Sequence, residues 1–142
     1  MLINSGIFSD GKGAVSIVPF FNYDLQHLKN KINTLLLATA WLVLITFLLC
    51  IPGNNLPKVG LFNFSQFDKL VHIFMFGMLS FLFCKTTNIK KWFFVIASLC
   101  TVYGIAMEFV QENWIPNRSF DVLDIAADAV GSFLVLLILK KC

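Results

Sequence analysis

The chain has 142 residues, of which 58% are hydrophobic and only 13% are charged, and its mean hydropathy is +0.79. This composition excludes an ordinary soluble domain and indicates an integral membrane protein with room for about four spans of roughly 20 residues each. The net charge of +3 comes from scattered basic residues instead of a one-faced patch, so we expect no nucleic-acid partner.

The amino-terminal residues 1–31 contain glycines, a proline and isolated charges, without the ordered regions of a signal peptide. We predict an irregular cytoplasmic segment there, followed by a single domain over residues 32–142. Four apolar segments in that domain, at about 32–51, 67–84, 92–110 and 121–139, predict membrane spans. Short connections favour antiparallel neighbours, so the predicted fold is all-α, a membrane-embedded bundle of four transmembrane helices.

The basic residues predict the orientation of the bundle. Most lysines flank the start of the first span, the connection between the second and third spans, and the end of the fourth. Because basic residues near span ends are retained in the cytoplasm, both termini are predicted to be cytoplasmic. The start of span two, the end of span three and the start of span four then share the outer face.

Ionisable and polar residues gather at this predicted outer face. A charged side chain at the centre of a membrane helix costs roughly 2.5–3.5 kcal/mol, so such residues are candidates for a functional site. The candidates for ligand binding, or for a polar cluster that only fixes helix register, are Asp68, His72, Glu108, Gln111, Arg118, Asp121, Asp124 and Asp128.

Three of the acids have a simpler interpretation as helix caps. Asp68 follows Ser65 at capping-box spacing, and Asp121 and Asp124 suit the N-cap and first turn of the fourth span. His72 lies one turn after Asp68, where an acid can orient or protonate its imidazole. Capping and a role in a site therefore both remain open for Asp68.

The other acids do not fit a capping role. Glu108 is near the carboxyl end of its span, where the helix dipole disfavours an acid, and Gln111 lies within hydrogen-bonding spacing of it. Asp128 is one turn deeper than Asp124, too far along to cap the helix, so it needs a partner.

Few cations are available to balance these acids. Arg118 is the predicted partner, because its planar guanidinium binds carboxylate or phosphate with two hydrogen bonds, while Lys69 is expected to reach toward the interface. The excess of acids indicates shared protons, a bound divalent cation or a cationic ligand. We predict no organic cofactor.

Several of these positions occur together in a known pattern. Pro52-Gly53 follow the first span, Asp68, Lys69 and His72 open the second, and Glu108 and Gln111 close the third; Pro116, Arg118, Asp121 and Asp124 lead into the fourth. This order resembles the VanZ-like family of small bacterial membrane proteins over roughly residues 35–139. The family commonly has asparagine where this chain has Asp128, which adds an acid to the cluster.

The resemblance implies a multi-pass protein of the bacterial cell membrane. The family's namesake is associated with resistance to the glycopeptide antibiotic teicoplanin, so one expectation is an outward-facing site that binds an envelope lipid or a glycopeptide. The alternatives are an enzyme acting on a lipid-linked envelope substrate, with His72 as base or ligand, and a structural polar cluster. The oligomeric state stays open.

Overall fold

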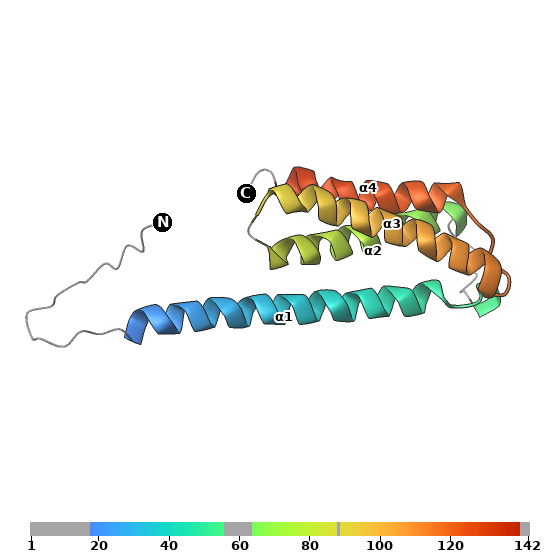
Figure 1. The fold of residues 1–142 in the computed structure, drawn as a ribbon. Coiled ribbons are helices and arrows are strands. Elements are labelled where there is room, and N and C mark those ends of the chain that lie inside the picture. The colour runs from blue at the N-terminus through green and yellow to red at the C-terminus, as the bar shows by residue number, and fades with distance from the viewer. Residues whose placement is uncertain (1–17, 56–63, 88, 140–142) are drawn as a thin grey trace, which may run out of the picture.

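The computed structural model describes residues 18–55, 64–87 and 89–139. Four long helices cross the molecule side by side (Figure 1), and the described residues contain no strand. The helices are α1 (Val18–Leu49), α2 (Phe64–Thr86), α3 (Lys91–Trp114) and α4 (Val122–Leu139), with a short 3-10 helix, η1 (Gly53–Asn55), after α1. Each long helix contains a stretch apolar and long enough to cross a membrane, which confirms the predicted four-span, all-α fold.

The amino-terminal prediction needs one correction. Helix α1 begins at Val18, so residues 18–31 are helical and not irregular. The candidate span within α1 is Leu25–Leu49, which starts earlier than the predicted residue 32. No proline or glycine follows Pro19 in this stretch, so nothing in the local sequence stops the helix before the apolar segment. The rest of the predicted amino-terminal segment, residues 1–17, lies outside the described residues.

Helices α2 and α4 form the tightest seam of the bundle. A Cβ atom placed on Gly131 would overlap the backbone of Ile73, and one on Gly77 would lie 3.3 Å from the Gly131 carbonyl oxygen. A Cβ on Gly104 of α3 would meet the side chain of Asp128 on α4. Small residues therefore let the backbones approach closely, as is usual where helices pack in a membrane.

Helix α1 packs against α2 through an apolar core that includes the fully buried Ile45, and a few hydrogen bonds add to this packing. The Trp41 indole donates to the Met75 carbonyl of α2 (3.1 Å), and the hydroxyls of Thr46 and Tyr103 lie 2.7 Å apart. Contact between α1 and α3 is otherwise sparse, and Figure 1 shows α1 running along one side of the other three helices.

One end of the bundle gathers the end of α1, the start of α2, the end of α3 and the start of α4 (Figure 1). The turn after α1 is joined to the α3–α4 connection, because the Gly53 amide donates to the Pro116 carbonyl (3.2 Å). A Cβ on Gly53 would overlap the Asn117 carbonyl, and Asn117 adopts a φ of 58°, a left-handed conformation that asparagine tolerates. The convergence that the predicted topology required is therefore present.

Candidate functional site

A network of charged side chains fills this end of the bundle. We define the polar end cluster as Asp68, Lys69 and His72 of α2, Glu108 of α3, and Asp121, Asp124 and Asp128 at and after the start of α4. Three helices that are distant in sequence thus supply one site. Every acid predicted for the site lies in this cluster.

The deepest part of the cluster is a hydrogen-bonded pair. The Nδ1 atom of His72 lies 2.8 Å from Oδ1 of Asp128, and both side chains are only 2% exposed. The His72 ring also stacks on Phe76, with ring centroids 6.3 Å apart. The prediction that Asp128 needs a partner is confirmed. The hydrogen-bonding acid of His72 is Asp128, however, and not Asp68 as the helical spacing suggested.

Lys69 links the two acids at the start of α4. Its Nζ donates to Oδ2 of Asp121 (2.8 Å) and to Oδ1 of Asp124 (2.7 Å), and its side chain is 20% exposed. The expectation that Lys69 only reaches toward the interface is therefore wrong. The hydrogen bond from Lys69, aided by the Leu123 amide, holds the pKa of Asp121 below its usual value.

Asp121 has a second role as the N-cap of α4. Its Oδ1 accepts a hydrogen bond from the Leu123 amide (2.8 Å), and its carbonyl accepts the amides of Asp124 and Ile125. Its own amide donates to Oε2 of buried Glu108 (3.0 Å). The predicted capping of α4 is confirmed, and Glu108 fixes the position of the cap.

The two remaining predicted partnerships are not formed. Gln111 is buried, but its Nε2 donates to the Leu49 carbonyl (2.9 Å) instead of contacting Glu108. The Nε atom of Arg118 lies 3.5 Å from the Ile51 carbonyl oxygen, and Arg118 forms no ion pair within residues 18–55, 64–87 and 89–139. Both side chains therefore tie the end of α1 to the α3–α4 end of the bundle.

Asp68 is the acid without a committed partner. Helix α2 begins at Phe64, so Asp68 lies beyond the first turn, and the predicted capping box with Ser65 is wrong. The half-buried Asp68 makes no hydrogen bond or ion pair with any residue that the structure describes. One ligand atom each of Asp68, His72 and Asp124 lie within 4.8 Å of one another.

The chain matches the model of one protein family. The model of the VanZ/LLP1 family matches residues 13–141, nearly the whole chain. The chain belongs to the VanZ/LLP1 family. No curated protein and no solved structure matches it. The VanZ/LLP1 family assignment confirms the resemblance drawn from the residues, and together with the four apolar helices it supports an integral membrane protein.

Sequence reasoning named Lys69 but left it out of the candidate site, although it is the central cation of this VanZ/LLP1 chain. The available signal was its place in the second predicted span, one turn ahead of His72, where a lysine without a partner would be expensive. Arg118, by contrast, lies outside the helices, in the α3–α4 connection that follows Pro116. Position within a span was therefore a better guide to the cation of the cluster than the hydrogen-bonding chemistry of the guanidinium group.

Proposed function

We propose that this VanZ/LLP1 protein binds an envelope lipid whose head group carries an ammonium, with the polar end cluster as the head-group site. The observation that carries the proposal is Asp68, a carboxylate beside His72 and Asp124 that has no hydrogen-bond or ion-pair partner among the described residues. The cluster has five acids against one lysine and one histidine, which favours a cationic group over an anionic one. Asp68 is therefore the proposed contact for the ligand's ammonium.

A zwitterionic head group fits the charges best. Lys69 uses two of its three N–H donors on Asp121 and Asp124, so among the described residues one donor is left for a phosphate oxygen. An ammonium linked to that phosphate can then reach Asp68, the residue immediately before Lys69 on α2. Membership of the VanZ/LLP1 family supports a bacterial cell membrane as the proposed location. The lysine distribution supports the proposed orientation, with both termini cytoplasmic and the cluster at the outer face.

Calorimetry in detergent tests this proposal with two short-chain lipids. Wild-type protein is expected to bind dihexanoyl phosphatidylethanolamine more tightly than dihexanoyl phosphatidylglycerol, which lacks the ammonium. In Asp68→Asn this preference should fall by at least about tenfold, since a hydrogen bond to a charged group contributes about 1.5–3 kcal/mol. The matched control is Glu112→Gln, which removes an exposed acid near the same end of the bundle.

Two results would count against the lipid. Equal binding of both lipids by wild-type protein would contradict the proposal that the site recognises an ammonium. Binding of teicoplanin that depends on Asp68, without any lipid preference, would assign the same cluster to a glycopeptide. That outcome corresponds to an accessory role in antibiotic resistance of the kind associated with the family's namesake.

A second candidate is a membrane enzyme that acts on a lipid-linked substrate. It is favoured by the His72–Asp128 hydrogen bond, because a carboxylate that orients imidazole prepares it as a general base or metal ligand. Asp68, His72 and Asp124 are the residues that would hold a divalent cation. Lys69 already compensates Asp124, which weighs against the metal. Metal analysis of wild-type and His72→Gln protein, with an assay for turnover of envelope lipids, tests this candidate.

A further inference from the structure

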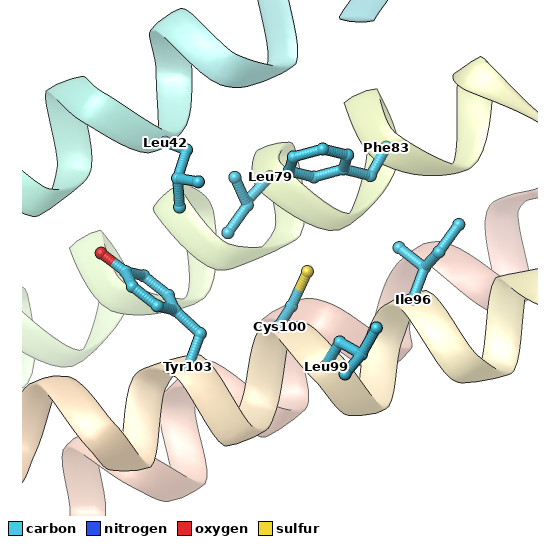
Figure 2. Close-up of a pocket in the computed structure, with 7 residues that line it drawn as sticks. All are labelled: Leu42, Leu79, Phe83, Ile96, Leu99, Cys100 and Tyr103. Carbon is cyan, nitrogen blue, oxygen red and sulfur yellow. The ribbon is translucent and has the colours of Figure 1, made fainter.

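A second binding feature lies outside the polar end cluster. A pocket of about 230 Å³ lies between α1, α2 and α3. Figure 2 shows the side chains that line it, which are Leu42, Leu79, Phe83, Ile96, Leu99, Cys100 and Tyr103. The lining is almost wholly apolar. The Tyr103 hydroxyl at one end is hydrogen-bonded to Thr46, so it offers little to a polar ligand. The chemistry of the pocket therefore suits hydrocarbon.

The pocket lies in the apolar part of the membrane spans, below the cluster. Leu79 follows His72 by seven residues in α2, and Cys100 precedes Glu108 by eight in α3. At 1.5 Å per residue, these separations place the pocket roughly 10–12 Å from the cluster along the helix axes. Half of the hydrocarbon core is about 15 Å thick, so a chain descending from a head group at the cluster reaches this depth.

The mouth of the pocket opens to the outside of the bundle. Leu99 lines the pocket and yet is 62% exposed, and contact between α1 and α3 is sparse. Above the pocket, Phe76 packs between His72 and Tyr103, with ring centroids 6.3 and 6.0 Å away. An aromatic column thus connects the buried pair of the cluster to the pocket.

The size of the pocket decides among possible occupants. An apolar cavity of roughly 150 Å³ is enough for benzene, so 230 Å³ accommodates a segment of one hydrocarbon chain. An α-helix with its side chains is about 10–12 Å across and does not enter such a space. A chain segment from the surrounding bilayer is the occupant that matches both volume and lining.

We infer that the pocket between α1, α2 and α3 binds one hydrocarbon chain of the lipid whose ammonium head group contacts Asp68. This inference rests on the proposed function for the identity of the head group. The pocket itself requires only an acyl or prenyl chain. The protein then binds one lipid at two places: the polar end cluster binds its charged head group, and the pocket within the membrane spans binds its hydrocarbon chain.

Photocrosslinking of the purified full chain tests the inference. The probe is phosphatidylethanolamine with a diazirine in the middle of one acyl chain, and mass spectrometry locates the labelled residues. Leu99→Trp and Leu42→Trp narrow the pocket from two helices, so either variant can serve if the other fails to fold. Val102→Trp is the control, since Val102 lies on α3 with similar exposure (60%) but does not line the pocket.

We expect labels on Leu99, Cys100 and Tyr103 in wild-type protein. Labelling should fall about tenfold in both pocket variants, as when roughly two methylene groups lose their contacts, and should persist in Val102→Trp. Labels spread evenly over the exposed faces of α1 and α3, or pocket variants that label like wild type, would overturn the inference.

The chain site and the head-group site can fail separately. If Asp68→Asn keeps wild-type head-group preference while Leu99→Trp still loses labelling, the proposed function fails and the chain site stands. If Asp68→Asn loses the head-group preference while Leu99→Trp keeps wild-type labelling, the inference of a chain in the pocket is wrong and the head-group site stands.

Discussion

The α2–α4 seam and the α1–α3 side of the bundle are held together in different ways. Along the seam, glycine backbones approach closely and the His72–Asp128 pair is buried. On the other side, α1 packs through apolar side chains such as the fully buried Ile45, aided by a few hydrogen bonds, and an apolar pocket remains between α1, α2 and α3. The contrast teaches that polar residues in this membrane protein sit where packing is tightest. The less tightly packed side instead has the apolar pocket in which we propose that a lipid chain binds.

The largest expected effect comes from breaking the buried pair of the seam. His72→Leu leaves Asp128 without its partner, and loss of one member of a buried pair costs about 3–5 kcal/mol. The double variant His72→Leu with Asp128→Leu should recover much of that loss, because no unpaired charge remains. Unfolding in mixed micelles gives the free energies. A double variant as unstable as the single one would contradict this account of the seam.

The next effect comes from the close backbone approach. Gly131→Val places atoms where the backbone of Ile73 lies, and overpacking of this kind typically costs about 1–3 kcal/mol. Ala126→Val, at an exposed position of the same helix, is the matched control and should change stability little. Thermal unfolding in detergent measures both. Similar melting temperatures for the two variants would mean that the seam is looser than described.

A smaller effect is expected at Asp121, at the exposed edge of the cluster. Its pKa is lowered in the folded protein, mainly by Lys69, so its stabilising contribution is full above the unfolded-state pKa. That contribution is lost as the pH falls through the lower folded pKa, below about pH 4. Asp121→Asn should therefore flatten the acid limb of the melting temperature measured between pH 6 and pH 3. An unchanged acid limb would exclude this contribution.

The smallest effect is expected at Arg118. Its Nε donates one long hydrogen bond of 3.5 Å, to the Ile51 carbonyl, and Arg118 has no ion pair among the described residues. Arg118→Gln should therefore change stability by less than about 0.5 kcal/mol. Lipid preference in calorimetry should also stay at the wild-type value. A large loss of either would restore the sequence-based expectation that Arg118 is the central cation.

Periodicity and topology were sufficient to predict much of this molecule. The four spans follow from apolar segments of membrane length, and antiparallel connections bring Glu108 to the same end as His72 and Asp124. The need of Asp128 for a partner followed from its depth in the helix. These predictions depend only on the geometry of single helices and on their order, and both can be read from the spacing of residues in the sequence.

Partner choice within the cluster was not predictable in the same way. Spacing along one helix favoured Asp68 with His72 and Glu108 with Gln111, whereas the structure pairs residues across helices. Those pairings depend on how far each helix is rotated and shifted against its neighbour. Glycines such as Gly131 set that register through backbone contact, and a single sequence does not specify their partners.

Native mass spectrometry of protein extracted from its own membrane is the most direct test of the head-group site. Wild-type protein and Glu112→Gln are predicted to retain a lipid with an ammonium head group, which Asp68→Asn loses. Identical retained lipids in wild-type and Asp68→Asn protein would contradict the central claim that the uncommitted carboxylate of the polar end cluster recognises the ligand.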